Sequence, residues 1–177
     1  MYRFAAACRT ESIVFGACRP GYSEVQIQHW ISFMKSQGMQ RVCCLLEKDQ
    51  LIRYPDLLGS YNQAFGTDNV CSAPIADFEI CDRTTLQHTI LPFLLVSDHR
   101  QQKTVVHCSG GIGRTGHVLA AWLVFGRGVS QRAAIQAVRQ MGRNPYEAVI
   151  AAPLRGKNLL RVRADLHQLL DAGHLNE

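Results

Sequence analysis

The sequence predicts an α/β fold in which a mostly parallel sheet of about four or five strands is flanked by helices. Short apolar runs alternate along the chain with longer segments whose apolar residues recur at helical spacing. The runs contain few polar side chains, which is typical of parallel strands covered on both faces. This alternation builds one sheet between helical layers. No repeat or long linker interrupts it, so we expect a single domain over residues 1–177.

Four apolar runs are expected to form the strands, because turn residues bound them. They cover residues 13–17, 41–46, 69–75 and 104–108. The first run ends at Arg19-Pro20-Gly21, which is typical of a turn. The fourth run leads through a glycine-rich loop into a helix that is apolar enough to be buried.

Helices are expected between these runs. The first follows Ser23, a good N-cap residue, and ends before Gly38. Its apolar residues fall on one helical face: Ile27, Trp30, Ile31 and Met34. Residues 55–65 are ambiguous and could hold a short helix. Residues 84–96 are predicted to be helical with a kink or break at Pro92, because proline lacks the N–H that a helix needs.

The chain after residue 108 is predicted to be almost entirely helical. Helices are expected through residues 118–125, after Ser130, and through residues 159–170. The first of these ends at Gly126 or Gly128. Asn144 before Pro145 could start one more short helix, with Asn144 as its cap.

Composition bounds the class of protein. The 19 basic and 14 acidic residues give a net charge of +5, which suits an anionic substrate but does not select nucleic acid. The seven cysteines include no Cys-x-x-Cys pair, so neither a disulfide framework nor a structural zinc site is expected. The apolar run at 118–126 is about half as long as a membrane span. We therefore expect a soluble, cytoplasmic protein that does not act on membranes.

The segment His-Cys-Ser-Gly-Gly-Ile-Gly-Arg-Thr-Gly at 107–116 carries the chemistry. Cys108 ends a buried strand, and Arg114 opens an apolar helix six positions later. Glycines let successive N–H groups turn into one concave nest at a helix N-terminus, which favours an anion. The planar fork of Arg114 can hold two phosphate oxygens. We expect phosphate to be bound by the loop residues Ser109, Gly110, Gly111, Ile112, Gly113 and Arg114.

The same N–H groups and guanidinium should favour the thiolate form of Cys108. A thiolate facing a bound phosphoryl group is suited to in-line attack on phosphorus, which forms a cysteinyl-phosphate. Thr115 could hydrogen-bond Cys108 and stabilise the thiolate when it leaves. His107 could hold the loop and support Cys108, or it could simply be packed in the core. No metal or cofactor is needed for this attack.

Two simpler interpretations of this segment fit less well. A purely structural glycine turn has no need of Cys and Arg at this spacing between a strand and a helix. A nucleotide-binding P-loop would continue with Gly-Lys-Ser/Thr, which is absent.

The segment resembles the Cys-x5-Arg loop of the cysteine-dependent protein tyrosine phosphatase superfamily, and the short chain is similar to its compact dual-specificity-like branch. Residues 16–20 and 142–145 also look like flanking segments of small prokaryotic members, so the resemblance covers about residues 10–150. It implies a hydrolase acting on phosphotyrosine and/or phosphoserine/threonine in proteins.

The resemblance also implies an aspartate upstream of the cysteine that serves as general acid and base. Asp77 lies 31 residues before Cys108, just past a strand end where α/β sites form, and we assign it this role. Asp82 and Glu79 are the alternatives, and all three could be solvated loop carboxylates. The family usually has a proline a few residues on, where this chain has Cys81. That change predicts a more flexible loop or a displaced acid.

The substrate stays open at this point. Neutral loop residues favour phosphoproteins over inositol phosphates, and Tyr22, Tyr54 and Tyr61 are possible walls of the pocket. The alternatives are an RNA 5′-phosphatase, a small-molecule or phosphoinositide phosphatase, and an inactive phosphopeptide-binding module; nucleic acid is not the expected partner. The thiolate is also oxidisable, and a second thiol could protect it. The candidates are Cys43, Cys44, Cys71 and Cys81.

Overall fold

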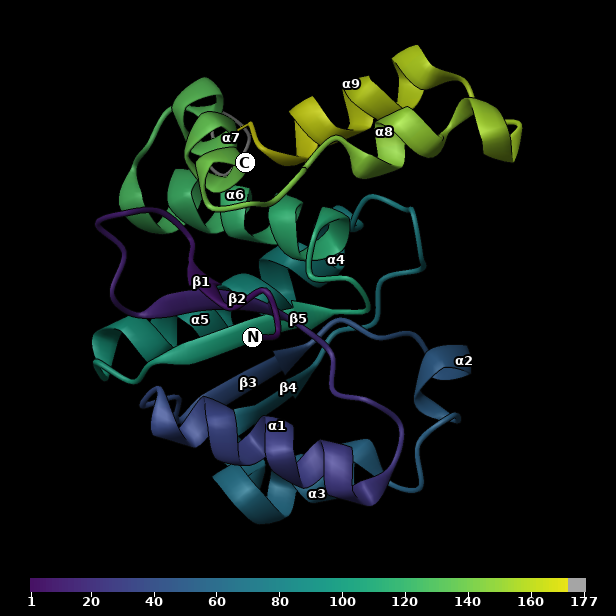
Figure 1. Ribbon diagram of the computed structural model, residues 1–177. Coiled ribbons are helices and arrows are strands. Elements are labelled where there is room, and N and C mark those ends of the chain that lie inside the picture. Colours follow the sequence, from purple (N-terminus) through teal and green to yellow (C-terminus); the bar gives the residue numbers. More distant parts are fainter. Residues whose placement is uncertain (172–177) are drawn as a thin grey trace.

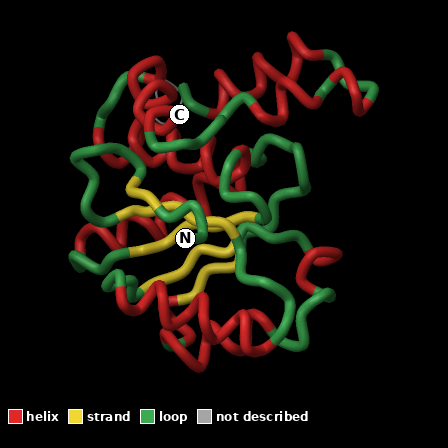
Figure 2. The backbone as a smooth tube through the Cα atoms, in the orientation of Figure 1, coloured by secondary structure: helices red, strands yellow, loops and turns green. Residues whose placement is uncertain are grey.

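The computed structural model describes residues 1–171 and contains a five-stranded sheet between two layers of helices (Figures 1 and 2). The strands are β1 (Ala5–Ala6), β2 (Val14–Cys18), β3 (Arg41–Cys44), β4 (Val70–Ser72) and β5 (Thr104–Cys108). Their order is β1-β2-β5-β3-β4, with β1 antiparallel and all other neighbours parallel. The predicted α/β class and mostly parallel sheet are confirmed.

The α-helices are α1 (Glu24–Ser36), α2 (Lys48–Leu51), α3 (Leu57–Phe65), α4 (Arg83–Thr85), α5 (Leu91–His99), α6 (Gly113–Arg127), α7 (Gln131–Gln140), α8 (Glu147–Ala151) and α9 (Leu159–Leu169). A π-helical turn, η2 (Leu86–Ile90), and two 3-10 turns, η1 (Thr67–Asn69) and η3 (Pro153–Arg155), complete the described part. No helix within residues 1–171 is both long and apolar enough to span a membrane.

Most predicted helix boundaries are confirmed. Ser23 and Ser130 each cap a helix by accepting a backbone N–H three residues on. Gly128, in a left-handed conformation, ends α6, so Gly126 lies inside the helix. The break expected at Pro92 takes the form of the η2 turn just before it, which leaves Pro92 in the first turn of α5, where no N–H is needed.

Three local predictions are wrong. The strand predicted over residues 69–75 is confined to β4, Val70–Ser72, and residue 69 belongs to η1. Asn144 is not the cap of α8, which begins at Glu147 after Tyr146. The Asn144 side chain instead accepts the Tyr146 N–H in a turn that precedes the helix. The strand predicted over residues 41–46 ends at Cys44, and the next residues lead into the unpredicted α2.

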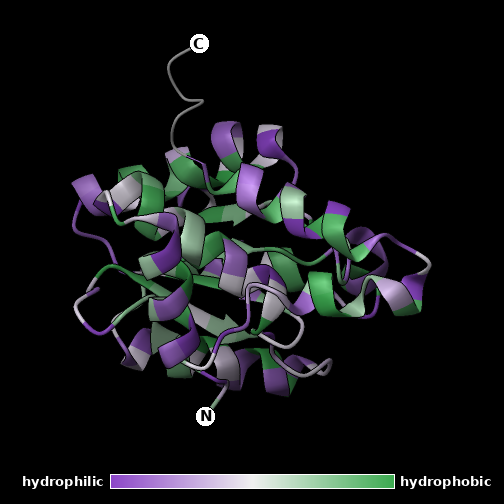
Figure 3. Ribbon diagram, turned by 90° about the horizontal axis from the view of Figure 1, so that it is seen from above, coloured by the Kyte–Doolittle hydropathy of each residue, from purple (hydrophilic) through white to green (hydrophobic). Residues whose placement is uncertain are grey.

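The two faces of the sheet build two cores. Helices α1 and α3 cover one face, and α5, α6 and the C-terminal helices cover the other (Figure 1). Side chains in and just after the strands alternate between them: Val14, Cys43, Leu45, Val106 and Cys108 face α6, whereas Ala17, Val42, Cys44, Leu46 and Val105 face α1. The surface helices show both hydrophilic and hydrophobic residues in Figure 3, as expected for helices with one face on a core.

The parallel strands bring four loops to one edge of the sheet. Register pairs Cys18 of β2 with Cys108 of β5, and Cys44 of β3 with His107. The loops that follow β2, β3, β4 and β5 therefore meet at their carboxyl ends, where ligands bind in open α/β sheets.

Candidate active site

The loop between β5 and α6 folds around the Cys108 sulfur. The Gly111 N–H donates to Cys108 Sγ over 3.2 Å, and Cys108 is only 2% exposed. Gly111 has φ of +68°, which favours glycine, and a Cβ built there would lie 2.5 Å from the Ala17 carbonyl oxygen. The loop thus turns back at Gly111 and directs an N–H group toward the sulfur, as the glycines in the sequence predict.

Arg143, which is 3% exposed, clamps this loop to its neighbours. Its guanidinium donates to the carbonyl oxygens of Gly111, Gly16 and Arg3, the last two at 2.7 and 2.6 Å. The sequence indicated residues 142–145 only as a flanking pattern. The clamp itself joins segments that lie far apart in the chain.

Arg114 is held in place by three partners. Its Nη1 donates to Gln50 Oε1 at 2.8 Å and to the Ile75 carbonyl at 2.9 Å. Its Nη2 forms an ion pair with Asp77 Oδ1 at 2.8 Å. Arg114 is 3% exposed, whereas the Asp77 side chain is 42% exposed. The structure thus brings the predicted aspartate to the predicted arginine.

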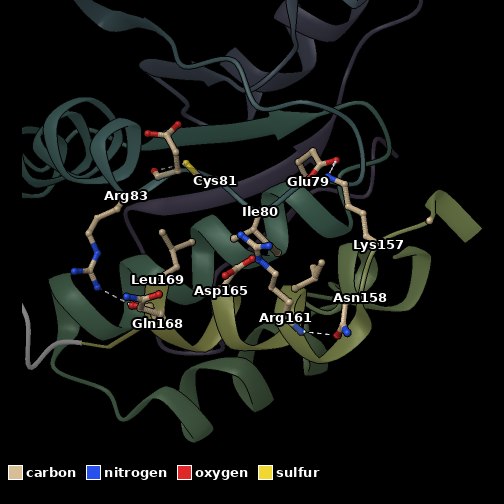
Figure 4. Close-up of a pocket in the computed structure, with 13 residues that line it drawn as sticks. Glu79, Ile80, Cys81, Arg83, Lys157, Asn158, Arg161, Asp165, Gln168 and Leu169 are labelled. Atoms are coloured by element: carbon tan, nitrogen blue, oxygen red, sulfur yellow. Dashed lines mark hydrogen bonds and ion pairs between the residues drawn. The ribbon is translucent and has the colours of Figure 1, made fainter. Parts of the chain in front are cut away.

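The two alternative carboxylates have other partners. Asp82 caps α4 by accepting the Thr85 N–H at 2.8 Å, and hydrogen bonds from Thr85 hold the pKa of Asp82 below its usual value. Glu79 pairs with Lys157 (Figure 4) and, at 3.8 Å, with Arg155, and both cations lie beyond α8 in the sequence. Of the three carboxylates considered, Asp77 is the one that contacts Arg114.

Thr115 lacks the contact expected of it, whereas His107 is packed in the core, which is one of the two roles considered for it. Thr115 Oγ1 is buried and has no hydrogen-bond partner within residues 1–171, so the expected bond to Cys108 is not formed. His107 Nε2 lies 3.2 Å from the Tyr61 hydroxyl, and its ring packs edge-on against Trp30. Tyr61 is completely buried in this contact, so its prediction as a pocket wall is wrong.

The other two tyrosines surround an arginine that sequence reasoning did not select. Arg19 donates from Nε to Ser109 Oγ at 3.3 Å and from Nη1 to the Tyr54 hydroxyl at 3.0 Å. Its guanidinium lies 3.9 Å from the centre of the Tyr22 ring. Arg19 thus adds a positive charge next to the loop, and Tyr22 and Tyr54 orient it.

Glu147 is a second unpredicted residue at the loop. Its carboxyl lies over Gly113, so closely that a Cβ at position 113 would overlap it. Burial raises the pKa of Glu147, and nearby Asp77 acts in the same direction, while a hydrogen bond from the Gly113 backbone opposes them. No local sequence pattern predicts this contact, because α6 and α7 separate the loop from α8 in the chain.

The cysteines are all free thiols. Cys43 and Cys71 are paired in register with each other on β3 and β4. The register partner of Cys108 is Cys18, which was not among the thiols considered from the sequence. Within residues 1–171, no three His, Cys, Asp or Glu side chains are grouped to hold a metal ion.

Gly111→Ala should lower kcat/KM by about a hundredfold, the usual effect of a displacement near 1 Å in a reacting geometry. The added Cβ meets the Ala17 carbonyl and a left-handed backbone, so the loop has to move. Gly110→Ala is the matched control, because nothing lies within 4 Å of a Cβ at that position. Equal kinetics for the two variants would contradict the importance of the loop conformation.

Acid should destabilise the fold through its two buried histidines. Burial lowers the pKa of His107 and of His117 to about 3, and the charge of Arg114 adds to this effect for both. An unfolded histidine titrates near about 6.5, so below that pH the unfolded chain binds protons that the folded chain does not. The free energy of unfolding should therefore decrease as the pH is lowered, by up to about 1.4 kcal/mol per pH unit for each histidine.

Urea titrations between pH 7 and 5 check this dependence, above the range in which most carboxylates protonate. His117→Gln should remove about half of the slope. A free energy of unfolding that does not change over this interval would contradict the burial of neutral histidines.

The fold is similar to that of several solved structures. Tk-PTP in its active form is 24% identical, with a TM-score of 0.68 over 89% of this chain and 93% of that one. Kinase associated phosphatase, with its catalytic-site cysteine replaced by serine, is 25% identical, with a TM-score of 0.64 over 82% and 89%. PTPMT1 in complex with PI(5)P is 14% identical, with a TM-score of 0.67 over 94% and 96%. A search of curated proteins finds no match.

The fold and the loop define a phosphatase of the cysteine-dependent protein tyrosine phosphatase superfamily, in its dual-specificity-like branch, as the sequence predicted. A family model described as "Polymorphic toxin system, DSP-PTPase phosphatase" matches residues 15–128, more than half of the chain. The chain belongs to that family.

Proposed function

We propose that the chain hydrolyses phosphomonoesters of tyrosine and/or serine/threonine in proteins through a cysteinyl-phosphate on Cys108. The observation that carries this proposal is the chain of contacts at one loop, the cup formed by residues 109–113: its Gly111 N–H donates to the Cys108 sulfur, and Arg114 at its end pairs with Asp77. These groups are suited to bind a phosphate anion, attack its phosphorus and protonate the leaving oxygen.

In the first step, the loop N–H groups and Arg114 hold the phosphoryl oxygens. The phosphate takes the place of Asp77 as the partner of Arg114, which releases the carboxyl toward the leaving oxygen. An electron pair on Cys108 Sγ forms the S–P bond while the P–O ester bond breaks. Protonated Asp77 gives its proton to the departing oxygen, so that the alcohol or phenol leaves neutral.

In the second step, Asp77 takes a proton from water as the water oxygen attacks phosphorus. The S–P bond breaks, its electron pair returns to sulfur, and inorganic phosphate is released. Arg114 and the N–H cup stabilise the charge on the transferred group in both steps. The cycle restores the thiolate and the protonated carboxyl and needs no cofactor.

The surroundings of the cup support a phosphorylated side chain as the substrate. Tyr22 lies beside Arg19, which donates to Ser109 of the loop, while buried Tyr54 holds Arg19 through its hydroxyl; this suits an aromatic ester with negative charge nearby. A phosphoinositide is the second candidate, because Arg19 adds a charge at the rim and PTPMT1, similar in fold, has been solved with PI(5)P.

Hydrolysis of para-nitrophenyl phosphate, with and without vanadate, tests the reaction. Vanadate-sensitive turnover is expected, and its absence would favour an inactive phosphopeptide-binding module. A panel of phosphopeptides, phosphoinositides and triphosphorylated RNA then tests the substrate, with kcat/KM for each as the readout. A preference for RNA or for a phosphoinositide would contradict the proposed protein substrate, but it would leave the proposed cysteinyl-phosphate mechanism unchanged.

A further inference from the structure

The loop that carries Asp77 ends at Cys81, where the family resemblance leads one to expect proline. The Cys81 N–H donates to His117 Nε2 over 3.2 Å. Proline has no N–H, so this bond exists only because another residue stands there. The departure from the family pattern therefore comes with a new contact to α6.

His117 is suited to accept this bond and to make a second one. It lies three residues after Arg114 on α6, and its side chain is 1% exposed. Burial and the charge of Arg114 lower the pKa of His117 to about 3, so the ring is neutral near pH 7. A ring nitrogen that accepts a hydrogen bond leaves the proton on the other nitrogen, and the Gly113 backbone hydrogen-bonds to the ring. His117 thus connects the first residue of α6 with the end of the Asp77 loop.

Arg114 also holds the start of this loop, through the Ile75 carbonyl at 2.9 Å and the Asp77 carboxyl at 2.8 Å. The remaining contacts of the loop are weaker or more exposed. The Asp77 N–H reaches Glu47 Oε1 only at 3.4 Å. The Glu79–Lys157 ion pair lies in an open groove against α9 (Figure 4), and a second ion pair joins Glu79 to Arg155; both cations are about half exposed. Ion pairs of this kind contribute little to rigidity. The Cys81–His117 bond, by contrast, joins two residues that are 3% and 1% exposed.

The loop between these anchors has a strained backbone. Phe78, directly after Asp77, has φ of +57°, an uncommon conformation for a bulky residue. Such a conformation persists only where the surrounding contacts hold it. A firm anchor at the end of the loop is therefore part of what keeps Asp77 next to Arg114.

We propose that His117 is a positioning residue of the phosphatase: by accepting the Cys81 N–H it fixes the Asp77 loop to the helix that carries Arg114. This inference rests on the proposed function, in which Asp77 protonates the leaving group. His117 itself touches neither the substrate nor the reacting atoms.

The test compares leaving groups, because only a poor leaving group depends on a well-placed acid. His117→Leu removes the acceptor, and kcat for phenyl phosphate should fall tenfold to about a hundredfold, as for other displacements near 1 Å. For 2,4-dinitrophenyl phosphate, which leaves without a proton, kcat should change less than about threefold. Inhibition by vanadate should be unchanged, because the phosphate loop is intact. His117→Gln should recover most of the loss, since its amide oxygen can accept the same N–H.

Variants of the donor test the same bond from the other side. Cys81→Pro removes the N–H and should reproduce the leaving-group effect of His117→Leu, whereas Cys81→Ala keeps the N–H and should behave as wild type. The double variant His117→Leu/Cys81→Pro should be no worse than His117→Leu alone, because Cys81→Pro removes a bond that His117→Leu has already removed. If His117→Leu fails to fold, the comparison of Cys81→Pro with Cys81→Ala still decides the matter.

Three results would overturn the inference. The first is an equal loss of kcat for phenyl phosphate and 2,4-dinitrophenyl phosphate in His117→Leu. The second is vanadate inhibition of His117→Leu that weakens as much as its kcat falls. The third is wild-type kinetics for Cys81→Pro. Failure of the proposed function looks different. In that case the single variant Asp77→Asn would lose the same fraction of kcat with both leaving groups. The inference about His117 would then be wrong as well.

Discussion

Cys108→Ser should lower phosphatase turnover by a factor on the order of a thousand or more, the size expected when a covalent nucleophile is removed. The hydroxyl of serine has nearly the shape of the thiol, so the cup and Arg114 should keep their geometry. It is not ionised near pH 7, however, and nothing in the cup acts as a base to activate it. The measurement is kcat with para-nitrophenyl phosphate, together with phosphopeptide affinity.

The phosphopeptide affinity of the variant shows whether only the reaction is lost or the binding site is lost as well. Cys108→Ser should bind phosphopeptide at least as tightly as the wild type does and hold it unhydrolysed. Cys18→Ser, on the neighbouring strand and in register with Cys108, is the matched control and should keep most of the activity. Substantial turnover by Cys108→Ser would remove the nucleophile from the mechanism.

Asp77→Asn should lower kcat for phenyl phosphate by a factor of about 10² to 10⁴, the usual contribution of a general acid. An amide can neither give the proton to the leaving oxygen nor take one from water. One limb of the pH–rate profile should become flat, because the group that produces it is gone. The loss should shrink with 2,4-dinitrophenyl phosphate, which needs no proton.

Asp82→Asn and Glu79→Gln are the controls for this assignment. Asp82 caps α4, and asparagine caps nearly as well, so that variant should stay folded and active. Glu79→Gln breaks two exposed ion pairs and should change kcat only slightly. An unchanged rate for Asp77→Asn, with a large loss in either control, would move the role of the acid to that residue.

The sequence was sufficient to predict the phosphate loop because its parts are close in the chain. Cys108, the glycines and Arg114 lie within seven residues. A completely buried apolar strand ends at Cys108, and a helix that is buried along most of its length follows. The turn of the loop then brings the Gly111 N–H to the sulfur. Asp77 was selected because the family resemblance implies an aspartate upstream of the cysteine, and its place just past a strand end agrees with the edge of the sheet where the carboxyl ends of parallel strands meet.

The residues that support the loop could not be found in this way. Arg19, Gln50, Arg143 and Glu147 reach it from four other segments, and each contact depends on tertiary packing. His117 was visible beside the motif, but its partner Cys81 lies 36 residues upstream. The strand β1 was missed because two residues carry no periodicity. Tyr61 was misplaced because the sequence does not distinguish a buried aromatic from one that lines a pocket.

The central claim is that the Cys108 sulfur forms a bond to phosphorus during turnover, and trapping that bond is the most direct test. Asp77→Asn should slow the breakdown of the intermediate, so rapid quenching of this variant after mixing with 2,4-dinitrophenyl phosphate should catch it. Mass spectrometry is expected to find one phosphoryl group per chain, on the peptide that contains Cys108. Continued turnover with no phosphoryl group on Cys108, or with the label on another residue, would contradict the account.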